Sequence, residues 1–169
     1  EPYRRQRQMC IRDRGYEVEL LNADVAPVFA SVSRKKADVF MDAWLPVTMK
    51  DYIDQYGDQI EFIGEVYDSG RVGLVVPQYV TIDSIGELAA HKGQFSSEIV
   101  GIDAGAGIMK TTDKAIGDYG LDGYKLLTSS SSTMLASLQK AMEKEAWIVI
   151  TGWTPHWICL LYTSPSPRD

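Results

Sequence analysis

The sequence predicts an α/β fold, and three observations indicate it. Short apolar segments alternate along the chain with segments that have the apolar spacing of amphipathic helices, a pattern typical of helices packed on a largely parallel sheet. Two such blocks, joined by an extended segment, indicate two lobes or parts of two lobes. Aromatic or glycine-rich loops follow three of the expected strands, and in such folds ligands bind on the loops at the carboxyl ends of strands.

The first block is expected to alternate strands with helices. Apolar segments at 16–21, 37–41 and 60–63 have the length of strands. Residues 27–35 and 46–56 are expected helices, because a proline stands in the first turn of each, where its missing N–H costs no hydrogen bond.

Residues 70–77 and 82–90 lead from the first block to the second. The first of these segments, GRVGLVVP, is a nearly continuous apolar run, which is typical of a strand buried on both faces. The second segment weakly favours a short helix.

The second block repeats the alternation. Its expected strands and helices are 99–103, 108–119, 124–127, 132–145 and 147–151. Apolar side chains recur on one face of the last expected helix, and serines at 129–132 are suited to capping its N-terminus.

The two ends of the chain do not resemble the middle. Residues 1–14 and 159–169 lack helix or strand periodicity, and residues 4–13 and 159–169 match conceptual translations of a common transposase sequencing adapter. We expect both to be non-native tails, so that the biological sequence runs over 15–158. Both cysteines lie in these tails, so residues 15–158 offer no disulfide, thiol nucleophile or thiolate metal site.

Charge and composition exclude some classes of function. The whole chain of 169 residues has a net charge of −6, whereas a nucleic-acid partner would require a basic surface. No segment approaches the roughly 20 apolar residues that span a bilayer. His91 and His156 are the only histidines, and they lack the paired spacing of a metal site. We expect no metal, no cofactor and no nucleic acid.

Trp44 and Trp153 are the first candidate ligand-binding residues. Each indole lies in a loop that follows an expected strand and is followed within two residues by a proline. The face of an indole attracts cations, by about 2 kcal/mol when desolvated. A quaternary ammonium has no N–H to donate, so a protein binds it through such faces. The alternative is that each tryptophan packs between layers of the fold.

The Gly105-Ala106-Gly107 loop is the second candidate element. It ends a strand and opens the expected helix 108–119, where free amides and the helix dipole favour an anion. Neither a dinucleotide-binding glycine pattern nor a phosphate-binding loop is present, because the third glycine and the Gly-Lys-Ser/Thr motif are missing. A plain tight turn is the alternative. Together, the two elements suit a zwitterion, with its carboxylate on the amides of Gly107 and Ile108.

Four motifs resemble the glycine betaine-binding proteins of the OpuAC type. They are Ala43-Trp44-Leu45-Pro46, Gly73-Leu74-Val75-Val76-Pro77, Gly101-Ile102-Asp103-Ala104-Gly105-Ala106-Gly107-Ile108-Met109 and Ile150-Thr151-Gly152-Trp153-Thr154-Pro155-His156-Trp157. The resemblance implies a two-lobed periplasmic-binding-protein (type II) fold, incomplete in this chain. It places about 15–70 in one lobe, 71–97 in a crossover region and 98–158 in the other lobe.

The resemblance also implies a function and a site. Such proteins deliver betaines to an ABC permease on the periplasmic or extracellular face of the membrane, and a lipid anchor or a permease fusion would hold the full-length protein there. Two tryptophans of the family's ammonium cage match Trp44 and Trp153, and its two carboxylate-binding amides match Gly107 and Ile108. The third tryptophan is expected upstream of residue 15, in a segment that this sequence does not contain.

One position departs from the family pattern. Met49 stands where the family usually has a carboxylate-binding histidine, and a thioether has no hydrogen to donate. Glycine betaine, proline betaine, carnitine, choline and a sulfonium analogue therefore stay open as ligands. His156, beside Trp153, is expected to orient that loop. Two other functions stay open as alternatives, an enzyme acting on a methylated amine and a ligand-sensing domain, although no catalytic set accompanies the tryptophans.

Overall fold

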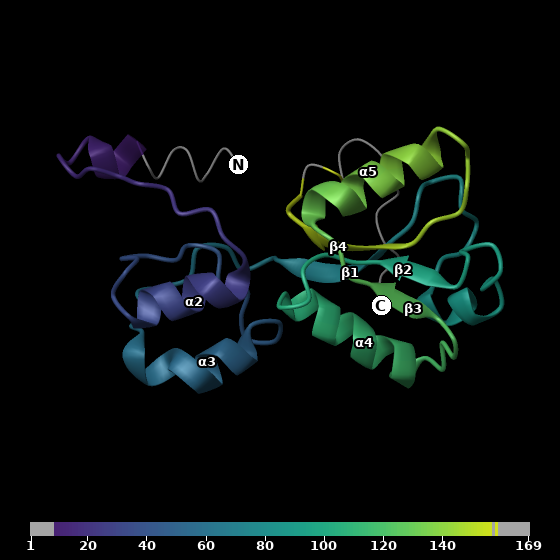
Figure 1. Ribbon diagram of the computed structural model, residues 1–169, viewed down its shortest axis with the longest axis horizontal. Helices are drawn as coiled ribbons and strands as arrows, with labels where there is room; N and C mark the ends of the chain where they lie inside the picture. Colours follow the sequence, from purple (N-terminus) through teal and green to yellow (C-terminus); the bar gives the residue numbers. More distant parts are fainter. Residues whose placement is uncertain (1–8, 157, 159–169) are drawn as a thin grey trace.

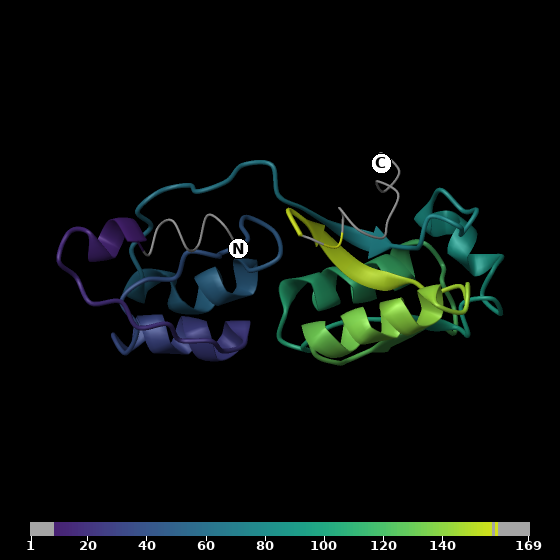
Figure 2. The same ribbon diagram turned by 90° about the horizontal axis from the view of Figure 1, so that it is seen from above.

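The computed structural model describes residues 9–156 and residue 158, and it forms two parts that lie side by side (Figure 1). The first part contains helices α2 (Val25–Ser33) and α3 (Lys50–Tyr56), with the short 3-10 helix η1 (Gly57–Gln59) after them. The second part contains a four-stranded sheet and two longer helices. A single extended stretch of chain, just before residue 71, leads from one part to the other (Figure 2).

The sheet belongs to the second part and has the strand order β1-β4-β2-β3. Its strands are β1 (Arg71–Val75), β2 (Glu98–Val100), β3 (Lys125–Leu127) and β4 (Ile150–Thr154). Strand β2 pairs in parallel with β3 and β4, whereas β1 pairs antiparallel with β4. The expected largely parallel sheet is therefore parallel at its centre and antiparallel at one edge.

Helices cover both faces of this sheet. In Figure 1, α5 (Ser131–Met142) lies above the strands and α4 (Gly107–Asp118) lies below them. The side chains of Met134 and Leu138 anchor α5 in a cluster with Ile150 of β4. The Ser130 hydroxyl accepts a hydrogen bond of 3.1 Å from the Thr133 amide, so the expected serine cap of this helix is confirmed.

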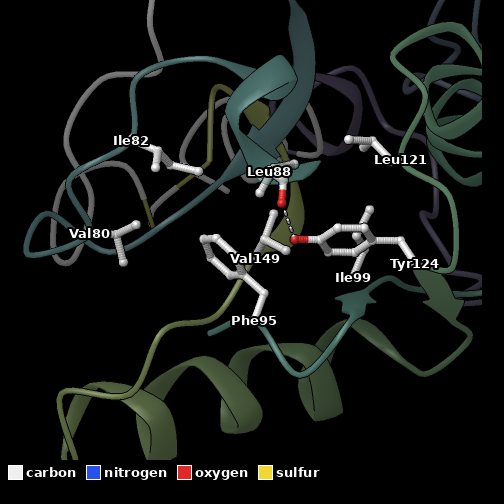
Figure 3. Packing of buried hydrophobic residues seen from close by; sticks show 8 residues of the cluster. All are labelled: Val80, Ile82, Leu88, Phe95, Ile99, Leu121, Tyr124 and Val149. Carbon is white, nitrogen blue, oxygen red and sulfur yellow. Dashed lines mark hydrogen bonds between the residues drawn. The ribbon is translucent and has the colours of Figure 1, made fainter. Parts of the chain in front are cut away.

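A separate apolar core holds the far end of the second part together (Figure 3). It is built from Val80, Ile82, Leu88, Phe95, Ile99, Leu121, Tyr124 and Val149. The Tyr124 hydroxyl donates to the Leu88 carbonyl at 2.8 Å, which satisfies the one polar atom that this ring brings into the core. This end includes the 3-10 helix η2 (Ile85–Ala89), where a helix at 82–90 was expected.

Three expected strands do not form. Residues 16–21, 37–41 and 60–63 run without strand pairing, and large apolar side chains such as Leu20, Val39 and Ile63 are exposed. A strand is stabilised by hydrogen bonds to a neighbour, and within the described residues these segments have no neighbouring strand. The apolar pattern alone therefore predicted strands that are not there.

The apolar run at 70–77 does form a strand, but not the buried central strand that was expected. Strand β1 lies at the edge of the sheet, and its residues are half-buried or exposed. It still matters for the site, because it runs antiparallel to the strand that carries Trp153. The domain boundaries expected at 15–70, 71–97 and 98–158 stay predictions, as do the tails, which lie largely outside the described residues.

Candidate ligand-binding site

Trp44 is held in a tight turn just before α3. Its indole N–H donates to the Asp42 carboxylate at 2.8 Å, and its backbone carbonyl accepts from the Met49 amide at 3.1 Å and the Thr48 hydroxyl at 2.8 Å. The residue is half-buried. Both the backbone and one edge of the ring are therefore fixed, while part of the side chain stays accessible.

Met49 supports this turn through its side chain. Its side chain is buried, and its sulfur accepts the Trp44 backbone N–H at 3.2 Å. A thioether is a weak acceptor and no donor, so it can hold the turn but cannot donate to a carboxylate. The structure thus gives Met49 a contact with the tryptophan, and its expected contact with ligand stays a prediction.

The glycine loop before α4 is fixed at both ends of Gly105. The Gly105 amide donates to the Asp103 carboxylate at 2.9 Å, and its carbonyl accepts from the Tyr52 hydroxyl at 2.7 Å. Burial raises the pKa of the Tyr52 hydroxyl, with the neighbouring Asp103 adding to the effect, so this hydroxyl stays a proton donor at neutral pH.

Helix α4 then begins at Gly107 without a side-chain cap. Ala106 is its N-cap residue, and no side chain caps the first turn among the described residues. The first amides of a helix have no partner within it, and they carry the positive end of its dipole. The amides of Gly107 and Ile108 are in this position, which is the one expected for an anion site.

The loop of Trp44 packs directly on this helix start. A methyl group added to Gly107 would overlap the Thr48 carbonyl and would lie 2.7 Å from the Thr48 Cβ. An exposed ion pair between Lys110 of α4 and Asp51 of α3 joins the same two elements. The first and second parts of the molecule therefore meet at the place where α4 begins.

Trp153 approaches the same helix start from the sheet. It lies on β4 opposite Val72 of β1, and it packs against a cluster made of Ala106, Ile108 and Met109. The ring of Trp44 lies against Gly70, so that a Cβ built there would be 3.0 Å from the Trp44 Cζ3 atom. Both tryptophans therefore lie beside the same short stretch of chain, residues 70–72, at the start of β1.

His156 lies beside Trp153, as expected. The two ring centroids are 4.8 Å apart in an edge-to-face arrangement, and the His156 Nδ1 atom accepts the Ile158 amide at 3.2 Å. Burial lowers the pKa of His156, which keeps the imidazole neutral and able to accept at Nδ1. Trp157, in the same motif, lies outside the described residues.

Two residues of this site were missed in the sequence. Tyr52 lies three residues after Met49, on the same face of the helix expected at 46–56, and that spacing was an available signal. Thr48 had no signal, because its role comes from a backbone carbonyl lying against Gly107. Among the described residues, no three His, Cys, Asp or Glu side chains are grouped so that they could hold a metal ion.

Comparison with known proteins decides the family. Residues 7–163 match the substrate-binding domain of the ABC-type glycine betaine transport system. The chain belongs to this family. The resemblance noted in the four sequence motifs is thereby confirmed, and the family's solved structures show the same fold.

Two solved members of the glycine betaine family superpose closely on the chain. The glycine betaine/L-proline-binding protein ProX of Borrelia burgdorferi gives a TM-score of 0.88 at 32% identity, over 96% of this chain and 62% of that one. Lactococcal OpuAC, solved closed with glycine betaine, gives 0.87 at 34% identity, over 94% and 62%. These matches confirm the type II periplasmic-binding fold.

Two further relatives are named for choline and for glycine betaine and carnitine. A choline-binding protein solved with choline gives a TM-score of 0.78 at 26% identity, over 90% of this chain and 56% of that one. The glycine betaine/carnitine transport binding protein GbuC of Listeria monocytogenes is 43% identical over 95 residues, which are 55% of this chain and 30% of that protein. The chain thus spans less than two thirds of each of these four relatives. No helix among its described residues is long and apolar enough to cross a membrane.

Proposed function

We propose that this chain captures glycine betaine, or a related quaternary-ammonium osmolyte, and delivers it to the permease of an ABC importer. The observation that carries the proposal is the convergence at the start of α4. The Trp44 loop packs on Gly107 through Thr48, and Trp153 packs beside Ile108, so two indoles accompany one uncapped helix start.

The cationic end of the ligand is assigned to the indoles. A trimethylammonium group spreads its charge over methyl groups and makes no hydrogen bonds, so it is held by dispersion and by the negative faces of aromatic rings. The Trp44 N–H is already bonded to Asp42, which fixes how this ring is presented. The carboxylate of Asp42 also adds negative charge on the side of the cation.

The anionic end is assigned to the amides of Gly107 and Ile108. The distance between these amides and the indoles would select ligands by length. Because Met49 offers no donor, two amides and the helix dipole hold the carboxylate without a histidine. A hydroxyl tail such as that of choline is then a reasonable competitor, and one relative binds choline.

The proposed activity is capture without chemistry. The relatives named above are binding proteins, and two polar side chains beside the indoles already have hydrogen-bond partners. Asp42 accepts from the Trp44 ring, and His156 accepts a backbone amide beside Trp153. The proposed location follows from the proposed partner, since an importer takes its ligand from the periplasmic or extracellular side, with a lipid anchor or a permease fusion as the attachment.

Calorimetry on matched tryptophan variants tests the proposal. Trp44→Leu and Trp153→Leu keep apolar bulk but remove the aromatic face, so each should raise the Kd for glycine betaine about thirtyfold, which corresponds to roughly 2 kcal/mol. Trp147→Leu is the control, because this indole packs on His91 and Phe95, away from the site. Its Kd should stay within about twofold of the original value.

A neutral ligand isostere separates charge from shape. In 3,3-dimethylbutanoate a carbon replaces the ammonium nitrogen, so the cation–π attraction is lost while the size is kept. The chain should not bind it measurably. Absence of heat with glycine betaine, carnitine and choline alike, or an unchanged Kd in both site variants, would overturn the proposed function.

A further inference from the structure

Tyr52 connects the two parts of the molecule at the glycine loop. It belongs to α3 in the first part, and its hydroxyl donates to the Gly105 carbonyl of the second part at 2.7 Å, across 53 residues of sequence. Its ring is stacked on Phe29 of α2, with centroids 4.9 Å apart and planes within 7° of parallel. The stack on Phe29 thus holds the ring in place while its hydroxyl is bonded to Gly105.

Gly105 is fixed on both sides by polar groups from different elements. Asp103 accepts its amide at 2.9 Å, and Tyr52 donates to its carbonyl. The peptide plane after Gly105, which carries the Ala106 amide, therefore has a defined orientation, and the next two peptide planes carry the amides of Gly107 and Ile108. The Ala106 amide is bonded back to the Asp103 carbonyl at 3.0 Å, which leaves Gly107 as the first amide available to a ligand.

We infer that Tyr52 is a positioning residue for the anion-binding amides, so that it determines how strongly the site prefers a carboxylate-bearing ligand over one without a carboxylate. The inference rests on the proposed function, since it assigns the carboxylate to the amides of Gly107 and Ile108. Tyr52 acts on the ligand through the loop, because its hydrogen is already donated to Gly105.

Two consequences distinguish this role from a merely structural one. A carboxylate on a preorganised pair of amides loses affinity when the loop loosens, whereas a trimethylammonium group contacts the indole faces and makes no hydrogen bond to the loop, so its affinity should fall less. Because the two partners of the bond lie in different parts of the molecule, the anion site is complete only when the parts are docked. Carboxylate binding and docking therefore favour each other.

The Tyr52→Phe variant tests the inference, because it removes one hydroxyl and keeps the stack on Phe29. The matched control is Tyr79→Phe. It also loses a hydroxyl-to-carbonyl hydrogen bond of 2.7 Å, to Ala146, but both of these residues lie within the second part of the molecule. Calorimetry measures the Kd of glycine betaine and of choline for each protein. Tyr52→Phe should raise the Kd for glycine betaine about three- to tenfold and that for choline less than about twofold, while Tyr79→Phe should change neither by more than about twofold.

A second readout does not depend on choline affinity. In amide ¹H–¹⁵N spectra, Tyr52→Phe should move the Gly107 and Ile108 signals and should reduce the shift that glycine betaine causes in them, without moving the Trp44 indole signal. Equal weakening of both ligands, an unchanged glycine betaine Kd, or unmoved Gly107 and Ile108 amides would each overturn the inference while leaving the proposed function standing. If the unaltered chain binds neither glycine betaine nor choline, both the inference and the proposed function are overturned.

Discussion

Replacing Gly107 with alanine is the sharpest perturbation that the structure offers. The added methyl would overlap the Thr48 carbonyl and stand 2.7 Å from the Thr48 Cβ, whereas ordinary contact begins at 3.4 Å. The obstacle is backbone, so no rotamer change removes it. The Trp44 loop must move away from α4, or α4 must shift.

The cost follows from this geometry. Overfilling a packed contact costs about 1–3 kcal/mol, and here it separates the loop of Trp44 from the amides that are proposed to bind the carboxylate. We therefore expect Gly107→Ala to raise the Kd for glycine betaine at least about tenfold, with thermal unfolding shifted down by several degrees. Calorimetry and a thermal melt measure the two quantities on one sample.

Gly117→Ala is the control for this prediction. Gly117 lies in the last turn of the same helix, and nothing lies within 4 Å of an added Cβ. Alanine there should stabilise the chain by about 0.5–1 kcal/mol and leave binding unchanged. If Gly107→Ala bound glycine betaine like the unaltered chain, the contact between Thr48 and α4 would not belong to the binding-competent arrangement, and the site would have to be sought elsewhere.

Two further predictions concern single hydrogen bonds, and a third concerns the titration of His156. Asp42→Asn keeps an acceptor for the Trp44 N–H, so it should weaken glycine betaine binding less than Asp42→Leu does. Calorimetry measures both Kd values, and equal values would show that this hydrogen bond does not orient the ring. Ser130→Ala removes the cap of α5 and should lower the free energy of unfolding by about 1 kcal/mol in urea titrations, and no change would contradict the cap. Because burial lowers the pKa of His156, the unfolded chain takes up a proton before the folded chain does as pH falls below about 6.5. The contribution of His156 is thus complete above that pH and is lost below it, so the melting temperature should fall less between pH 7 and 5 in His156→Gln than in the unaltered chain.

Local sequence signals predicted the second part of the molecule well. Helices α4 and α5 begin within a residue of where glycine and serine signals placed their starts, because capping and helical spacing are properties of neighbouring residues. The fold class and the family were predicted for a related reason, since the four motifs are contiguous stretches of sequence.

The errors concern pairing between distant segments. Residues 16–21 and 37–41 have apolar runs that suit a strand, yet a strand forms only where another strand is available to share hydrogen bonds, and sequence periodicity does not report that. The antiparallel edge position of β1 was missed for the same reason, because an apolar run does not specify which strand lies beside it.

The ligand contacts of the candidate site stay predictions, but its arrangement can be compared with the expectation. The loops of Trp44, Gly107 and Trp153 were expected to meet because each follows a predicted strand, whereas the segment before Trp44 is not a strand and Trp153 lies within β4. The bond from Tyr52 to Gly105 joins residues that no local pattern relates. The sequence therefore indicated which groups could carry the proposed chemistry, and the structure was needed to find what holds those groups in place.

The register between β1 and β4 has a consequence for ligand size. Gly70 lies against the ring of Trp44, and two residues later Val72 lies opposite Trp153. Both tryptophans therefore lie beside residues 70–72, and the place of Trp153 along this stretch is set by the main-chain pairing of β1 with β4. In the proposed site, a shift of this pairing would move Trp153 relative to Trp44 and so change the length of osmolyte that fits between the indoles and the amides.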